Sequence, residues 1–231
     1  MVAGLDGCRG GWYIVQESTD GTITGRVCAS FRDALQLIPA PAPIAIDIPI
    51  GLKSSGARTC DLAARRALAP TRGSSVFPAP IRPVLHASTH KEASDMRRAV
   101  EGKGISIQSF NITGKIREVD AALRASPTDA DRVYEVHPEL CFASLNNAKP
   151  LSHSKKRASG RAERLALLAQ HFGDAPERLL AERPRDIVAA DDVIDAFVAL
   201  WTARRIANGT AASLPSVPEQ DELGLRMAIF T

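Results

Sequence analysis

The chain has 231 residues, a hydrophobic fraction of 45%, a charged fraction of 24% and a formal net charge of +3 at pH 7. These values are ordinary for a globular protein and argue against a disordered chain or a fibre. The small positive charge is compatible with a polyanionic partner but is not by itself evidence for one. The length predicts one domain over residues 1–231, with room for a large insertion.

The cysteine pattern and the apolar runs bear on the cellular environment. No Cys-x-x-Cys pair is present, no histidine lies at zinc-finger spacing from a cysteine, and no apolar stretch approaches the length of a membrane span. We therefore expect reduced thiols and a cytoplasmic protein without a membrane association. The cysteines are Cys8, Cys28, Cys60 and Cys141.

The opening residues predict three antiparallel strands. Residues 2–12 begin as an apolar strand that carries Asp6 into a glycine-rich turn, and residues 12–16 are rich in aromatic and β-branched types. An Asp-Gly hairpin signal then precedes a third strand over residues 22–29. Apolar residues at helical spacing predict a short helix over residues 31–38.

The next apolar run predicts a central strand. Residues 44–50 are apolar almost throughout, which is typical of a strand that is buried on both faces. Asp47 interrupts the run, and Pro49 cannot donate a hydrogen bond to a neighbouring strand. We therefore expect Asp47 to lie close to the end of this strand.

Residues 53–131 have an irregular pattern and predict an insertion that caps the edge of the sheet. Within it, residues 60–68, 87–101 and 113–124 predict helices. Residues 71–83 are rich in serine and proline and predict an ordered binding loop.

Strand character returns at residues 132–136, where Glu135 precedes His137-Pro138. A basic stretch leads into a predicted amphipathic helix over residues 160–172. The clearest helical pattern covers residues 189–207, and residues 225–230 predict a closing edge strand.

Four aspartates lie on elements that can converge. Asp6 and Asp47 lie near strand ends, and a helix over residues 189–207 carries Asp192 and Asp195 on one face. Buried carboxylates need a cation or hydrogen-bond donors, and Mg²⁺ or Mn²⁺ prefers carboxylate oxygens. Two ions about 3.5–4 Å apart can activate a water molecule and stabilise a leaving oxygen in phosphodiester cleavage.

The order strand, strand, strand, helix, strand, helix, strand, helix, with acids on the first, fifth and last elements, resembles the RNase H-like superfamily and its RuvC-like resolvase branch. More closely, the chain resembles a bacterial and archaeal family of unknown function whose members are described as predicted nucleases of this fold. The motifs that carry this resemblance are GLDGCRGGW at 4–12, AIDIPIGL at 45–52, SSVFP at 74–78, YEVHPE at 134–139 and SKK at 154–156.

The resemblance implies an α/β three-layer fold, with a mixed five-stranded sheet flanked by helices and a helical or loop insertion after the fourth strand. It also implies metal ligands, which by residue-to-residue match are Asp6, Asp47, Asp192 and Asp195. The superfamily more often has Glu at the second position, where this chain has the shorter Asp47. Glu135 on the next strand is a further catalytic candidate that could compensate.

Several basic and hydroxyl residues are candidates for binding a phosphate, because they donate hydrogen bonds or carry positive charge. A serine-rich turn beside an arginine is also typical of a simple turn, and a lysine run is also typical of a solvated face. His137, between two glutamates, could orient a carboxylate or transfer a proton. The candidates are Arg9, Arg72, Ser74, Ser75, His137, Lys155 and Lys156.

Together these features predict a metal-dependent nuclease or phosphoesterase that uses water as the nucleophile and Mg²⁺ or Mn²⁺ as cofactor. One alternative is a non-catalytic module that binds nucleic acid or protein through its basic stretch. Another is a nucleotide-binding protein related to the actin-like ATPases, whose first phosphate loop the turn after Asp6 resembles, although no second phosphate loop is evident. The substrate and the oligomeric state are left open.

Overall fold

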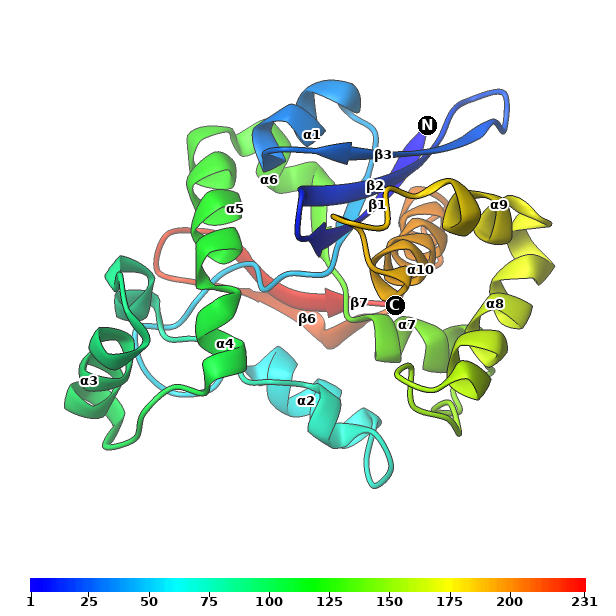
Figure 1. The fold of residues 1–231 in the computed structure, drawn as a ribbon. Coiled ribbons are helices and arrows are strands. Elements are labelled where there is room, and N and C mark those ends of the chain that lie inside the picture. The colour runs from blue at the N-terminus through cyan, green and yellow to red at the C-terminus, as the bar shows by residue number, and fades with distance from the viewer.

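The computed structural model describes all residues from 1 to 231 and contains a mixed five-stranded sheet in the order β3-β2-β1-β4-β5 (Figure 1). The antiparallel strands are β1 (Val2–Cys8), β2 (Gly11–Glu17) and β3 (Ile23–Cys28). The parallel strands that follow β1 across the sheet are β4 (Ile44–Ile46) and β5 (Val133–Glu135). This sheet and its flanking helices confirm the predicted RNase H-like class.

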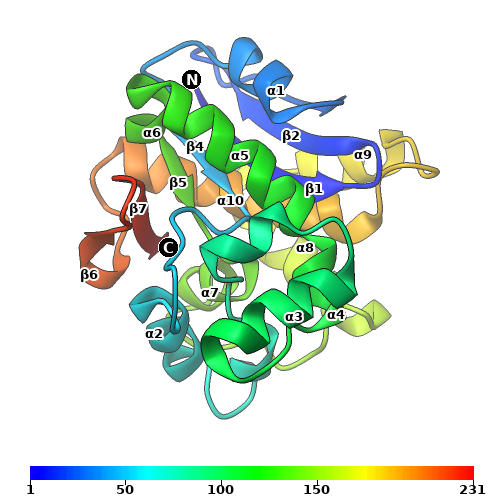
Figure 2. The same cartoon turned by 90° about the vertical axis from the view of Figure 1, so that its left-hand side faces the viewer.

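Helices cover both faces of the sheet because its central strands are apolar on both sides. Leu5 of β1 belongs to the core formed with α1 (Phe31–Leu37) and α5 (Thr113–Ala125), whereas Val2 belongs to the core formed with α10 (Ala190–Ala207). Figure 2 shows α1 and α5 in front of the strands and α10 behind them. The alternation of side chains along β1 therefore sends its odd-numbered and even-numbered residues into different cores.

Helix α10 lies at the centre of one layer. Its residues 193–203 are all buried, because β1 contacts one side and α7 (Pro138–Leu145), α8 (Ala158–Phe172) and α9 (Ala175–Glu182) contact the helix elsewhere. The sequence predicts the helix almost to the residue but assigns it a single apolar face. The observed helix is buried all round.

Gly4 lets α10 come close to the sheet. A Cβ atom at this position would lie 2.1 Å from the backbone nitrogen of Leu200 and 2.2 Å from the carbonyl oxygen of Ala196. Neither backbone atom can move independently of the helix. Any larger residue would therefore push α10 away from β1.

The segment between β4 and β5 contains five helices, in keeping with the predicted insertion. Helices α2 and α5 match their predictions within one residue at each end, whereas the helix predicted over residues 87–101 starts at His90, because the Thr89 side chain caps it by accepting from the Glu92 amide. Two 3₁₀ turns, Gly73–Ser75 and Arg82–His86, lie in the same segment. The helices are α2 (Thr59–Ala67), α3 (His90–Glu101), α4 (Ile107–Asn111), α5 and α6 (Pro127–Arg132).

Two strand predictions need correction. The strand predicted over residues 44–50 ends at Ile46, and the amide of Ile50 donates to the side chain of Glu135 instead of to a strand. The predicted edge strand is β7 (Arg226–Phe230), which forms a separate hairpin with β6 (Ser213–Gln220) and reaches the main sheet only through a bridge between Phe230 and Val136. Helices α7 and α9 and strand β6 are not predicted from the sequence.

None of the helices combines the length and the apolar character that crossing a lipid bilayer requires.

Candidate metal centre

Asp6 and Asp47 lie just past the last paired residues of the neighbouring parallel strands β1 and β4. The register pairs Leu5 with Ile46, and the amide of Asp47 donates to the Leu5 carbonyl at 3.1 Å. The hydrogen bonding between β1 and β4 therefore continues one residue beyond the end of β4. Ala45 packs in the core that contains α10, and the two-residue period of the strand directs the Asp47 side chain toward the same helix. One Asp6 oxygen, Oδ1, accepts from the Gly7 amide at 2.7 Å.

Asp195 approaches these two residues from α10. It is 2% exposed and lies immediately before Ala196, the residue whose carbonyl contacts β1 at Gly4. The close helix-to-sheet approach at Gly4 therefore brings a helical carboxylate within reach of the strand ends.

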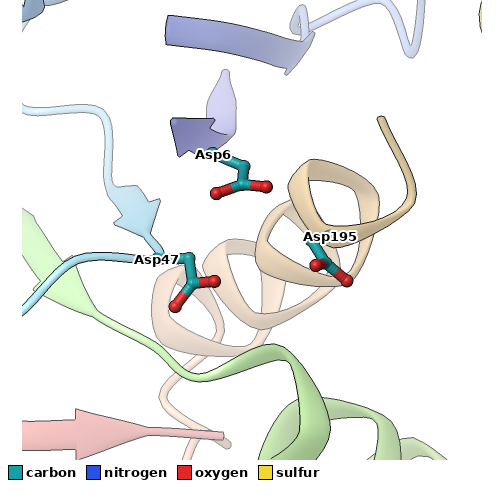
Figure 3. Close-up of side chains that lie close together, drawn as sticks. All are labelled: Asp6, Asp47 and Asp195. Carbon is teal, nitrogen blue, oxygen red and sulfur yellow. The ribbon is translucent and has the colours of Figure 1, made fainter. Parts of the chain in front are cut away.

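The three aspartates form one group. A carboxylate oxygen from each of Asp6, Asp47 and Asp195 lies within 4.8 Å of the other two, and the three side chains lie close together (Figure 3). Opposite oxygen ligands of a Mg²⁺ ion are about 4 Å apart, since each metal–oxygen distance is about 2.0–2.1 Å. The three carboxylates fit a hard divalent cation after a small inward movement, and the shorter side chain of Asp47 reaches the group.

Burial and mutual repulsion disfavour ionisation of these acids. The pKa of Asp6 is raised well above its usual value, first by burial and then by the neighbouring carboxylates of Asp47 and Asp195. Burial and the Asp195 carboxylate raise the pKa of Asp47 to about 7. A bound cation would reverse this effect by stabilising the ionised forms.

One cation already contacts the group. Lys155 Nζ lies 2.6 Å from Asp195 Oδ2, and the Asp195 carboxylate is the main cause of a raised Lys155 pKa. Lys155 comes from the segment between α7 and α8, 40 residues before Asp195 in the sequence. The sequence predicts Lys155 as a substrate-binding residue but does not predict its ion pair with Asp195.

Asp192 lies outside the group of three. Its Oδ2 accepts from the Ala189 amide at 2.8 Å, which caps the N-terminus of α10. Its pKa is raised, mainly by burial. The structure thus gives Asp192 a capping contact and brings only Asp195 of the two helical candidates into the group.

Glu135 also lies elsewhere. Its two carboxylate oxygens accept from Arg58 Nη1 and Nη2, each at 2.7 Å, and Oε2 also accepts from the Ile50 amide. Arg58 also pairs with Asp61 at 2.6 Å, and all three side chains are buried. This network ties the loop after β4 to β5, and it leaves no Glu135 oxygen without a partner.

The predicted phosphate-binding residues differ in exposure and in their contacts. Arg72 Nε donates to the carbonyl of Leu151, and Ser75 Oγ donates to the carbonyl of Arg72. His137 Nε2 lies 3.4 Å from the Ser75 carbonyl, its Nδ1 is buried without a partner, and burial lowers its pKa. The Asp195 carboxylate raises the His137 pKa and the Lys155 ammonium lowers it, each less than burial does. The exposed candidates are Arg9, Ser74 and Lys156.

Two further basic residues were missed by sequence reasoning. Lys115 of α5 donates to the carbonyl of Gly11, and its ammonium lies 4.5 Å from the centre of the Trp12 ring, so it borders the glycine-rich turn. Arg58 is 2% exposed and holds Glu135. Neither residue belongs to a motif, and Gly11 and Glu135, which they contact, are distant from them in the sequence, so no local signal identifies these contacts.

Comparisons with known proteins give one match. A family model described as "Protein of unknown function (DUF429)" matches residues 4–220. No curated protein and no solved structure gives a significant match. The matched region includes Asp6, Asp47 and Asp195 together with β2 to β5 and most of β1. The chain belongs to the DUF429 family of proteins of unknown function.

Proposed function

We propose that this protein is a divalent-metal-dependent hydrolase of phosphodiester bonds, a nuclease or a related phosphoesterase. The observation that carries the proposal is the convergence of Asp6, Asp47 and Asp195 from β1, β4 and α10, with oxygens within 4.8 Å of one another. Three carboxylates that repel one another in a partly buried site are unfavourable unless a cation binds there. An oxygen-only ligand set favours Mg²⁺ or Mn²⁺.

In the proposed reaction, the ion would activate water and the residues of the chain would hold the ion. A bound Mg²⁺ or Mn²⁺ would lower the pKa of a water molecule and stabilise negative charge on a phosphate. Asp6, Asp47 and Asp195 would hold the ion from three separate elements. During hydrolysis a water oxygen bonds to phosphorus, the ester P–O bond breaks, and the leaving oxygen takes up a proton.

Basic residues near the group support an anionic substrate. Lys155 contacts Asp195 directly, whereas Lys156 and Arg157 are exposed in the same segment and form no ion pair. Unpaired surface cations beside an acidic group are suited to phosphate contacts that position a substrate. We assign Lys156, together with Arg9, Arg72, Ser74, Ser75 and His137, to this outer substrate contact.

A panel assay would test the proposal. Wild-type protein is incubated with Mn²⁺ or Mg²⁺ and single-stranded DNA, duplex DNA, RNA or an activated small phosphodiester, with a chelator as the negative control. We expect cleavage of at least one substrate and a loss of at least 100-fold in Asp6→Asn, because one ligand and one charge are removed. Asp131→Asn is the matched control, since Asp131 is an exposed acid outside the group.

The same panel separates hydrolysis from simple binding. A non-catalytic module would bind nucleic acid in a salt-dependent way, and the wild type would cleave no substrate. The Asp6→Asn variant would bind nucleic acid as the wild type does. Full metal-dependent cleavage by Asp6→Asn would contradict the proposed site.

A further inference from the structure

We propose that the site binds a single divalent ion and that the ammonium group of Lys155 takes the place of a second one. This inference rests on the proposed function and specifies how positive charge is arranged in the site. It replaces the two-ion arrangement that the sequence predicts.

The Lys155 contact occupies one side of the acidic group. Lys155 Nζ lies 2.6 Å from Asp195 Oδ2, within charge-assisted hydrogen-bond distance. Asp195 is 2% exposed on its side chain, whereas the Lys155 side chain is 39% exposed. Lys155 therefore extends from solvent into the site and neutralises the most buried of the three carboxylates.

Enough oxygens remain for one ion without breaking this contact. Neither oxygen of Asp47 accepts a hydrogen bond, and Asp195 Oδ1 also has no partner. Asp6 Oδ1 accepts only from the Gly7 amide, which leaves Oδ2 free. One oxygen from each aspartate can thus bind an ion while Lys155 stays on Asp195 Oδ2.

Most of the ligands for a second ion on the α10 side are engaged elsewhere. Such an ion would need Asp195 Oδ2, which holds Lys155, and Asp192 offers it only Oδ1, because Oδ2 caps the helix through the Ala189 amide. Glu135 cannot substitute, since both of its oxygens are bound by Arg58. The donor atoms present suffice for one ion.

The charges are consistent with this arrangement. Three ionised carboxylates are balanced by one divalent ion and one ammonium group, so the occupied site is neutral. Because Lys155 is partly exposed, its ammonium can also contact a phosphate oxygen that approaches the ion. Lys155 would then act on the substrate charge that a second metal ion stabilises in two-metal enzymes.

Counting Mn²⁺ ions tests the proposal without any substrate. The full-length protein is titrated with Mn²⁺ by calorimetry, and free Mn²⁺ is measured in parallel by electron paramagnetic resonance. We expect one ion per chain in the wild type and in Lys155→Arg. In Lys155→Met we expect at least tenfold tighter binding of that ion, because a nearby positive charge is gone, and entry of a second, weaker ion at the freed oxygen.

Lys149→Met is the matched control, since it removes the same charge from an exposed position in the same segment and should titrate like the wild type. Methionine is close in length to lysine, and circular dichroism would confirm that each variant is folded. Two ions in the wild type, or an unchanged titration in Lys155→Met, would overturn this inference and leave the hydrolase proposal intact. No Mn²⁺ binding in the wild type would instead count against the proposed function itself.

Discussion

At the scale of one residue, the surroundings of Asp47 change the pKa of its carboxyl group. Its carboxyl group lies close to those of Asp6 and Asp195 in a partly buried setting, and its pKa rises to about 7. An unfolded aspartate has a pKa of about 3.9. Between these two pH values the folded chain therefore holds a proton that the unfolded chain has released.

This difference predicts a pH-dependent stability for the metal-free protein. Because the folded state binds the extra proton, the Asp47 contribution to the free energy of unfolding should fall as pH rises from about 4 to about 7 and then level off. Asp47→Asn should therefore stabilise the metal-free protein increasingly over that range. Urea unfolding at pH 5 and pH 8 checks this, with Asp131→Asn as the control that changes little at either pH. An equal effect of Asp47→Asn at both pH values would contradict the assignment.

The buried ion pair between Glu135 and Arg58 predicts that a substitution at Glu135 changes stability but not metal binding. Glu135→Gln leaves Arg58 buried with a weakened partner, and breaking such a pair costs about 3–5 kcal/mol of stability. Mn²⁺ affinity per folded molecule should stay within about twofold of the wild type, because Glu135 lies outside the acidic group. Urea unfolding and Mn²⁺ calorimetry measure the two quantities separately. A folded Glu135→Gln that no longer binds Mn²⁺ would restore Glu135 as a ligand.

At the scale of elements, the site depends on how closely α10 packs against β1. Gly4 permits that contact, and Asp195 lies one residue before the carbonyl that approaches Gly4. A small change in this helix-to-sheet spacing should therefore alter both stability and the separation of the carboxylates.

Gly4→Ala tests the packing. The added methyl group meets two backbone atoms of α10, and overpacking of this kind costs about 1–3 kcal/mol or more. We expect a loss of that size in urea unfolding together with weaker Mn²⁺ binding. Gly114→Ala is a matched control, since a Cβ there meets open space within α5 and should leave stability unchanged or slightly improved. Unchanged stability in Gly4→Ala would show that α10 can move away freely.

At the scale of the whole molecule, an ion held by β1, β4 and α10 links elements from both ends of the chain. Such an ion binds only the folded state and stabilises it by about 2.7 kcal/mol at a free concentration 100 times its Kd. A chain of this size then gains about 5–10 °C in Tm. Thermal unfolding with Mn²⁺ and with a chelator measures the gain, and Asp6→Asn should show none. An equal gain in Asp6→Asn would place the ion elsewhere.

The sequence by itself determined the class of fold, and its candidate acids include the three that form the group. These features follow from local patterns: apolar strand segments that lead into Asp6 and Asp47, and a long helix that carries Asp195 in its second turn. Only the tertiary structure decided which acids meet. Asp192 and Glu135 carry the same charge as their neighbours, but their partners, the Ala189 amide and Arg58, depend on cap geometry and on a contact 77 residues away in sequence. The Lys155–Asp195 pair spans 40 residues, and no local pattern specifies it, because side-chain pairing across elements is set by packing in three dimensions.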